Sequence, residues 1–197
     1  MRVEPDEYAA LDLRAHDLLA DAPLHDAWAV DLPGGGERSI ADIRAIVSFE
    51  NLARINVVVR FLFSLRGWLG RVFGWDAERP IPAGSSFVSR LSEEDRKASL
   101  VEPGTPEGPF RVLYVSRREA ISEIRNPTVH AFSVFALFGQ PGGHRFYWGI
   151  HVRPVGRITS WYMRLIDPFR RFLIYPAVLR HIRAAWERSA ADSPKIT

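Results

Sequence analysis

Four short segments rich in apolar and aromatic residues constrain the fold more than any other feature of the sequence. They cover residues 110–117, 119–125, 128–138 and 144–154. Segments of this length and composition, bounded by turn residues, are typical of strands. The links between them contain Asn126-Pro127 or the glycine-rich residues 139–143, and they are too short for a crossover helix. Because short links join antiparallel neighbours, the sequence predicts an antiparallel sheet.

After residue 156 the apolar residues change to helical spacing. Large apolar side chains recur at steps of three and four residues, at Trp161, Leu165, Phe169, Phe172, Leu179, Ile182 and Trp186. Asp167-Pro168 is a favourable helix start, with aspartate as the N-cap and proline in the first turn. We therefore expect a short helix at 158–166 and a long C-terminal helix from 168 to about 189, kinked near Pro168 and Pro176 because proline interrupts helical hydrogen bonding.

The first half of the chain is predicted to hold one strand and two shorter helices. Residues 1–20 look partly helical or loosely ordered, and 25–33 read as a strand that ends at a glycine turn. Ser39 is the expected N-cap of a short helix, with Asp42 in its first turn. A longer helix is expected at about 52–73. The proline-rich stretch 76–109 is expected to hold loops and one or two short strands, such as "SSFVSRL" at 85–91.

This order of elements predicts an α+β fold in which a curved antiparallel sheet wraps around the long C-terminal helix. The apolar face of an antiparallel sheet needs a cover, and the C-terminal helix supplies one. A sheet that grips a helix often leaves an apolar cavity between the two, which is a common place for a ligand. The length of 197 residues fits one domain.

Three segments of the chain resemble a known family. "VRFLFSLRGWLGRVFGWD", "VLYVSRREAISEIRNPTVHA" and "WYMRLIDPFRRFLIYPAVLRHI" resemble an uncharacterised bacterial family, a domain of unknown function that is grouped with the SRPBCC helix-grip superfamily of START, Bet v 1-type and polyketide-cyclase-like proteins. The resemblance covers about residues 20–190. It implies a helix-grip fold with a hydrophobic cavity, but it implies no reaction and transfers no catalytic residue.

Composition excludes several classes of site. The chain has no cysteine, so it can hold neither disulfides nor thiolate-bound metal. Its six histidines include no pair at the helical spacing of a zinc motif, and no phosphate-binding glycine loop is present, so we expect no metal and no cofactor. The net charge is +3, and the arginines are scattered without a groove-reading motif, which argues against nucleic-acid binding.

The sequence also bears on membranes and location. The apolar run 55–75 is interrupted by Arg60, Arg66 and Arg71, which favours a buried helix of a soluble protein over a transmembrane helix. The N-terminus lacks the basic and apolar regions of a signal peptide, so we expect a cytoplasmic protein. The segment 161–176 has three interpretations: core, pocket wall, or a helix that contacts a membrane surface peripherally.

The hairpin at 128–154 carries His130 and His151, whose faces depend on the length of the turn. With a five-residue loop at 139–143, Phe138 pairs with His144, so that His130 faces the helix and His151 faces outward. The residues then predicted to face the helix are His130, Phe132, Val134, Ala136, Phe138, Phe146, Trp148, Ile150 and Val152. A four-residue loop would instead place both histidines on one face. We expect the first arrangement because it separates apolar from polar positions more cleanly.

Glu123 and His130 are the only candidates for chemistry. If Asn126-Pro127 is a two-residue turn, Glu123 lies opposite His130, with the side chains within about 4 Å. A carboxylate there stabilises the charged imidazole and orients its ring. The pair could act as general acid and base, orient a polar group of a ligand, or serve only as a structural hydrogen bond.

The favoured function is non-covalent binding of a hydrophobic or amphipathic small molecule between the sheet and the C-terminal helix. The residues expected to line that cavity are His130, Phe132, Trp148, Tyr162, Phe169 and Tyr175, with Arg170 or Arg171 at the mouth for an acidic group. One alternative is a cyclase- or dehydratase-like enzyme, favoured if Glu123 and His130 both point into a pocket. The other is a protein-interaction module, favoured by a filled core together with an exposed apolar patch.

Overall fold

The computed structural model describes residues 1–34, 36–47, 86–125 and 129–191. The helix expected at about 52–73 lies outside these ranges. The side chain of Tyr162 is likewise not described, although its backbone belongs to a described helix. The assignment of the whole chain to one domain stays a prediction.

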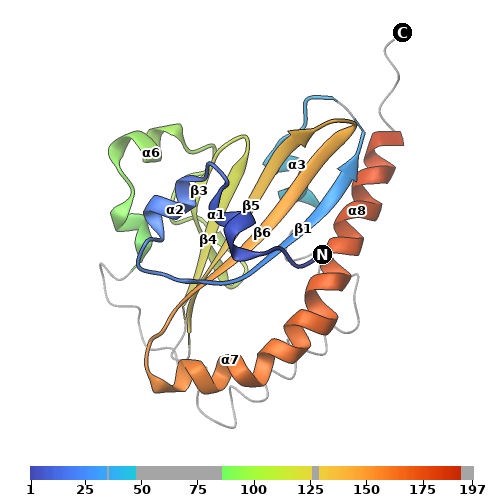
Figure 1. Cartoon of the computed structure of the whole chain (residues 1–197). Helices are drawn as coiled ribbons and strands as arrows, with labels where there is room; N and C mark the ends of the chain where they lie inside the picture. The colour runs from blue at the N-terminus through green and yellow to red at the C-terminus, as the bar shows by residue number, and fades with distance from the viewer. Residues whose placement is uncertain (35, 48–85, 126–128, 192–197) are drawn as a thin grey trace.

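Six antiparallel strands form one curved sheet in the order β1-β6-β5-β4-β3-β2 (Figure 1). The strands are β1 Leu24–Pro33, β2 Pro106–Glu107, β3 Phe110–Val115, β4 Glu119–Arg125, β5 His130–Gln140 and β6 Gly143–Arg153. The four strands expected after residue 109 correspond to β3, β4, β5 and β6. The predicted α+β fold with an antiparallel sheet and a long C-terminal helix is therefore confirmed.

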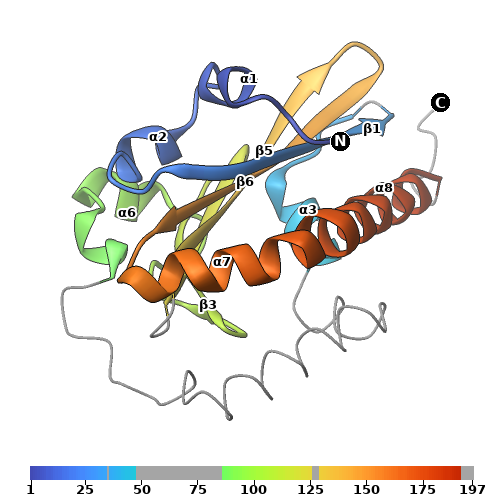
Figure 2. The same cartoon turned by 60° about the horizontal axis from the view of Figure 1, so that its bottom comes forward.

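Helical segments cover both faces of the sheet, not one (Figure 2). One face, here called the α2 face, packs against α1 Pro5–Ala9, α2 Arg14–Leu18 and the 3-10 helix η1 Phe87–Arg90, with α6 Glu93–Ala98 beside α2. The opposite face, the α8 face, packs against α3 Ile40–Ile46, α7 Arg157–Phe169 and α8 Tyr175–Ala191. Each face therefore has its own layer of core.

A conventional apolar core lies between the α8 face and its covering helices. Phe146, Ile150 and Val152 of β6 lie in one cluster with Leu179 and Ile182 of α8, and all are buried. Burial of apolar surface contributes roughly 25 cal/mol per Å², so this layer is a major source of stability. Of the apolar residues whose spacing predicted this cover, Leu179, Ile182 and Trp186 of α8 are buried against the sheet. The earlier ones, Trp161, Leu165, Phe169 and Phe172, are exposed, so the predicted apolar face is wrong for that half of the helix.

The register of the β5–β6 hairpin differs from the prediction. Gln140 pairs with Gly143, so the turn consists of Pro141 and Gly142 alone, and Gly142 adopts a φ of 79° that glycine tolerates best. The shift by one position sends β5 residues to the opposite face, because strand side chains alternate. His130, Phe132, Val134, Ala136 and Phe138 therefore share the α2 face with His151, whereas Phe146, Trp148, Ile150 and Val152 face α8 as expected.

The C-terminal helix is continuous where a new start was expected. Pro168 lies inside α7, and Asp167 does not cap a helix there. Between the two prolines, residues Arg170–Ile174 form a π-helical turn, η2, which leads directly into α8. Because a proline nitrogen cannot donate a hydrogen bond to the preceding turn, the helix changes to the wider π spacing here and changes direction (Figure 1).

Two local predictions have opposite outcomes. Ser39 caps α3 as expected, and the Asp42 side chain accepts from the Ser39 N–H in a reciprocal capping box. In the stretch expected as a strand at 85–91, the described residues do not form one, because Phe87–Arg90 form η1. The Ser86 hydroxyl accepts a hydrogen bond from the Val88 N–H and so caps η1. Such a local bond between a side chain and the backbone competes with strand pairing.

Within the described segments, no helix is both long enough and apolar enough to cross a membrane.

Candidate functional site

Glu123 and His130 form a buried pair on the α2 face. The His130 imidazole Nε2 lies 3.1 Å from the Glu123 carboxylate, and each residue exposes less than a twentieth of its surface (4% and 3%). The predicted contact within 4 Å is therefore present. Its geometry is diagonal, because Glu123 pairs with Phe132 and His130 pairs with Arg125. The expected pairing, with Glu123 directly opposite His130, was wrong by two residues. Because side chains alternate along a strand, a shift of two residues still leaves both side chains on one face.

The Glu123 carboxylate also holds η1 in place. It accepts hydrogen bonds from the Ser86 hydroxyl and from the Phe87 N–H, the latter at 3.1 Å. The Phe87 ring then packs edge-on against the His130 ring, with 5.2 Å between centroids. Burial raises the pKa of Glu123, but hydrogen bonds from His130, Ser86 and Phe87 outweigh burial and leave the pKa below its ordinary value. Glu123 is therefore an ionised anchor.

A hollow of about 280 Å³ opens beside this pair. It is lined by Ser86, Arg90, Arg125, His130, Arg153, Pro154 and Val155, and we call it the arginine pocket. These residues come from η1, the end of β4, the start of β5 and the end of β6. Three guanidinium groups, a hydroxyl and an imidazole therefore meet at one end of the sheet.

The three arginines are unequally neutralised. Arg90 donates to both oxygens of Asp21, at 2.6 and 2.9 Å, and its guanidinium lies 3.6 Å from the centre of the Phe87 ring. Arg153 approaches the same Asp21 at 3.7 Å. Arg125 has no ion-pair partner among the described residues. The pocket therefore has more positive than negative charge around it.

The structure separates the residues that were expected to line one cavity. His130 lines the arginine pocket, and Phe132 lies beneath it against Phe87, with 4.5 Å between ring centroids. The remaining described candidates, Trp148, Phe169, Tyr175 and Arg170, belong to the opposite side of the sheet or to the helix that covers it.

On the α8 face the aromatic candidates pack as core. The Tyr175 ring lies 5.0 Å from Trp28 and also 5.0 Å from Trp148, and the Trp148 indole donates to Ser133. Arg170 donates to the Tyr175 hydroxyl and to Asp167. Phe169, in contrast, points outward and is 40% exposed.

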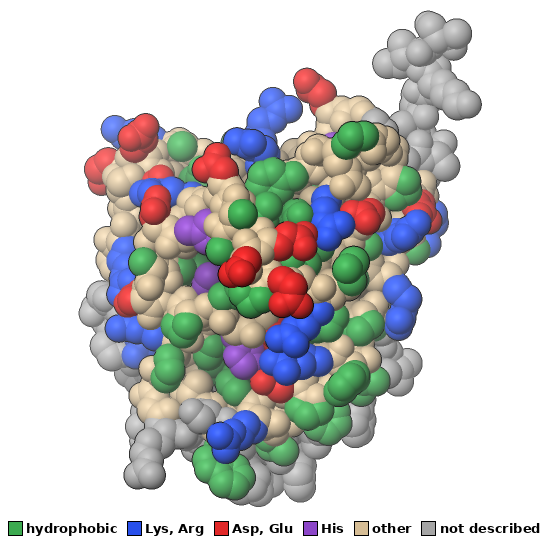
Figure 3. All heavy atoms as spheres, in the orientation of Figure 1, with side chains coloured by type: hydrophobic (Ala, Val, Ile, Leu, Met, Phe, Trp, Pro, Cys, Tyr) green, Lys and Arg blue, Asp and Glu red, His purple; other side chains and the backbone are tan. Residues whose placement is uncertain are grey.

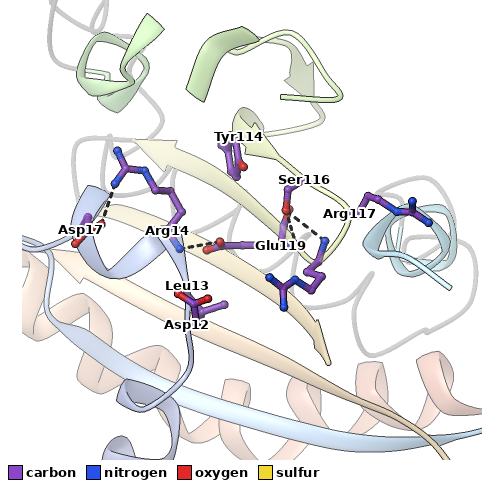
Figure 4. A pocket seen from close by; sticks show the side chains of 9 residues that line it. Asp12, Leu13, Arg14, Asp17, Tyr114, Ser116, Arg117 and Glu119 are labelled. Carbon is purple, nitrogen blue, oxygen red and sulfur yellow. Dashed lines mark hydrogen bonds and ion pairs between the residues drawn. The ribbon is translucent and has the colours of Figure 1, made fainter. Parts of the chain in front are cut away.

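A second hollow, of about 410 Å³, lies over the start of β4 (Figure 4). Its wall contains Asp12, Leu13, Arg14, Asp17, Tyr114, Ser116, Arg117, Arg118 and Glu119. The Glu119 carboxylate accepts the N–H groups of Arg14 and Ala15, both at 2.9 Å, so it anchors the first turn of α2. Burial raises the pKa of Glu119 above its ordinary value in spite of these two hydrogen bonds. Acidic and basic side chains both line this hollow, so it favours neither an anionic nor a cationic ligand.

His25, Asp26 and Asp167 bring three potential metal ligands within 4.8 Å of one another where β1 meets α7. The same carboxylates, however, pair with arginines. Arg171 lies 3.2 Å from Asp26, and Arg170 lies 3.2 Å from Asp167. Because these cations already neutralise the carboxylates, the cluster reads as an ion-pair network that joins helix to sheet and not as a metal site.

His151 has a different role from His130. Its Nδ1–H donates to the Ala22 carbonyl at 2.8 Å, and burial lowers its pKa. Its Nε2 and the Tyr8 hydroxyl have no hydrogen-bond partner in the described part of the chain. Tyr8 fits here because Gly149 has no side chain, since a Cβ on Gly149 would lie 2.1 Å from the Tyr8 hydroxyl. His151 is therefore a neutral packing residue under α1.

Sequence reasoning missed Ser86 and the three arginines of the pocket. Arg90, Arg125 and Arg153 stand far apart along the chain, and no spacing rule joins them. Arg125 and Arg153 could have been associated with His130 only through the correct strand register, in which both pair with His130.

The fold and the site define an α+β protein in which an antiparallel sheet with a helix-grip layout carries a buried Glu–His pair beside an arginine-lined pocket. Within this class, the chain belongs to the family described as Protein of unknown function (DUF2867), whose model matches residues 18–177. Comparisons with curated proteins and with solved structures give no significant match. The expected membership of an uncharacterised family is thus confirmed.

Proposed function

We propose that this protein is an SRPBCC-type helix-grip protein that binds an amphipathic small molecule non-covalently and holds its acidic group in the arginine pocket. The observation that carries this proposal is the convergence of Arg90, Arg125 and Arg153 with Ser86 and His130 on one hollow. Guanidinium groups bind carboxylate and phosphate groups in a planar, bidentate geometry.

Charge balance supports an acidic ligand. Arg90 is neutralised by Asp21, but Arg125 has no ion-pair partner in the described segments and Arg153 only a distant one, at 3.7 Å. An anion placed between Arg125 and Arg153 would supply the missing negative charge. A charge-assisted hydrogen bond of this kind is worth about 1.5–3 kcal/mol.

The Glu123–His130 pair supports binding in preference to catalysis. Glu123 does not line the pocket, and its carboxylate already accepts from His130, Ser86 and Phe87. Its lowered pKa also makes it a weak base. Glu123 therefore serves as a positioning residue that fixes the imidazole and η1 before the ligand arrives, which lowers the entropic cost of binding.

The apolar part of the ligand would leave the pocket over Pro154 and Val155. Both residues line the pocket, and Val155 is 43% exposed. A ligand cavity between the sheet and the C-terminal helix stays a prediction, since both hollows described above lie elsewhere. The cytoplasmic location stays a prediction as well.

The test compares two probes that differ only in their polar end. Octanoate and 1-octanol are titrated into the isotopically labelled chain, and the His130 imidazole signals are followed by NMR. We expect octanoate to shift these signals and octanol to leave them unchanged. Arg125→Ala should weaken octanoate binding at least about tenfold, since one charge-assisted hydrogen bond is lost.

Arg117→Ala is the matched control, because Arg117 is an exposed arginine whose described partner, Glu37, lies 3.5 Å away and outside the pocket. Equal binding of the two probes, or equal loss in Arg125→Ala and Arg117→Ala, would contradict the proposal. Native mass spectrometry of the purified chain provides an independent search for a co-purified acid.

A further inference from the structure

The side of α7 and η2 that faces the sheet carries charged residues among its apolar ones. This inward side includes Asp167, Arg170 and Arg171, whose side chains are only 17%, 15% and 34% exposed. A surface helix of a globular protein normally buries its apolar side against the core. In this helix, Met163, Ile166 and Ile174 pack against the core, but charged residues share that side with them, and the larger apolar side chains lie on the outside.

The outward side carries the large apolar residues. The exposed members are Trp161 (77%), Leu165 (49%), Phe169 (40%), Phe172 (78%) and Leu173 (43%). Their spacing of three and four residues places them in one stripe along the helix, which we call the α7 stripe. Figure 3 shows hydrophobic side chains together with basic ones along the lower edge of the molecule, where Figure 1 places α7.

Specific contacts hold the helix in this rotation. Asp167 lies 2.9 Å from the His25 imidazole, and Arg171 lies 3.2 Å from the buried Asp26. Both partners belong to β1. A rotation that buried the α7 stripe would break these contacts and leave the Asp26 carboxylate, which has no exposed surface, without Arg171. The exposure of the stripe is therefore built into the fold.

We propose that the α7 stripe docks on the surface of an anionic phospholipid bilayer, with its aromatic side chains at the level of the lipid headgroups. Aromatic and leucine side chains combined with arginines are the composition of helices that lie in a membrane interface. Arg164 is exposed within the stripe itself. Residues 157–191 contain seven arginines and only two acidic residues. Arg170 and Arg171 are paired inward, but Arg164, Arg180, Arg183 and Arg188 are exposed, and this excess of exposed positive charge complements a negative surface.

The same charge argues against a second copy of the chain as the partner. Pairing two α7 stripes would bring the exposed Arg164 of each copy into the same interface, and like charges in contact destabilise an interface. The inference is independent of the arginine pocket, because none of the stripe residues lines that pocket.

Flotation of the full chain with lipid vesicles tests the proposal. One set of vesicles contains phosphatidylcholine alone, and the other contains phosphatidylcholine mixed with phosphatidylglycerol. We expect the chain to float with the phosphatidylglycerol vesicles only, and binding to fall as salt is added. The double variant Trp161→Ser/Phe172→Ser should bind at least about tenfold more weakly, because two large apolar side chains no longer enter the interface.

Two further variants make the result specific. Leu100→Ser is the matched control, since Leu100 is 62% exposed but lies outside α7, and it should bind as the unmodified chain does. Arg164→Glu keeps every apolar residue and reverses one charge, so it should weaken binding to the phosphatidylglycerol vesicles. Circular dichroism checks that each variant retains its fold.

The proposal is overturned if the chain fails to float with phosphatidylglycerol vesicles, floats equally with both kinds, or is unaffected by the double variant. It is also overturned if the chain forms a dimer in solution that the double variant dissociates. That last result would assign the α7 stripe to contacts between copies.

Discussion

Each face of the sheet packs an apolar layer against its covering helices, but the polar contacts that join sheet and helices differ between the two faces. On the α2 face, buried polar side chains of the strands bind the backbone of the covering segments. Glu119 accepts from α2, Glu123 accepts from η1, and His151 donates to Ala22 after α2. On the α8 face, the contact is dominated by buried apolar side chains such as Leu179 and Ile182.

Helix length explains the difference. α1 and α2 contain five residues each, and η1 contains four, whereas α8 contains 17. Helices shorter than about 12 residues are marginal in isolation and bury little apolar surface. Short covering segments therefore add hydrogen bonds from the sheet to their apolar contacts, whereas the long helix α8 is held mainly by the apolar area along its side. The arginine pocket lies on the face with the short segments, where polar groups are already present.

The largest expected effect comes from removing Glu123. Glu123→Ala leaves the His130 imidazole and the Phe87 N–H buried without their partner, so we expect a loss of about 3–5 kcal/mol in the free energy of unfolding. Urea denaturation measures the loss. Hydrogen exchange should show it first in η1, which Glu123 anchors, before α8 loses protection.

Glu37→Ala is the control for Glu123→Ala, because the Glu37 side chain is 92% exposed and should contribute almost nothing. A loss below about 1 kcal/mol in Glu123→Ala would mean that η1 is held by its apolar residues instead. The contrast between the two faces would then disappear.

A second comparison lies within a single strand. Glu119 and Glu123 share β4 and the α2 face, yet their pKa values move in opposite directions from the ordinary 4.5. Burial is the largest influence on both. At Glu119 burial prevails over two backbone hydrogen bonds, and at Glu123 the imidazole, hydroxyl and backbone donors prevail over burial. The number and kind of hydrogen-bond donors thus decide the direction in which the pKa of each carboxyl group moves.

These opposite shifts predict opposite contributions to acid stability. The stabilisation from ionised Glu123 is present above pH 4.5 and is lost as pH falls through its lowered folded pKa. At Glu119 the folded state retains the proton more readily. Its contribution therefore grows as pH falls through its raised folded pKa toward 4.5 and diminishes as pH rises again.

Urea midpoints of the unmodified chain, Glu119→Gln and Glu123→Gln, recorded from about pH 3 to about pH 7, measure this contrast. On acidification, the advantage of the unmodified chain over Glu123→Gln should shrink, and its advantage over Glu119→Gln should grow. Parallel trends in the two variants would show that the donors around these carboxylates do not distinguish them.

Local sequence patterns were sufficient for elements that depend on neighbouring residues. Apolar composition between turn residues located β3 to β6, and Ser39 with Asp42 located the start of α3. Three- and four-residue spacing located the C-terminal helix. These features follow from hydrogen bonding and packing within a few residues, which a single sequence records directly.

Features that depend on how elements meet could not be derived in the same way. The apolar spacing of α7 predicts a helix but not its rotation, which the contacts of Asp167 and Arg171 with β1 decide. The arginine pocket likewise needs η1 beside β4, and Ser86 and Phe87 reach Glu123 across 37 and 36 residues of sequence. Such long-range partners leave no periodic signal.

The smallest predicted effect tests the hairpin register, on which the whole contrast between the faces depends. In the two-residue turn, Gly142 has a φ of 79°, and Pro141 before it has the position that proline favours in a type II turn. Alanine is strained at a positive φ, so Gly142→Ala should cost about 1 kcal/mol in the free energy of unfolding.

The outcome distinguishes the two registers because the longer loop would impose no such requirement on residue 142 alone. Gly139→Ala is the control: Gly139 belongs to β5, has no positive φ, and a Cβ there would meet nothing within 4 Å. Denaturation curves for the two variants should therefore differ by about 1 kcal/mol. Equal stabilities would favour the five-residue loop at 139–143. His130 and His151 would then lie on opposite faces, and Arg153 would no longer share a face with His130.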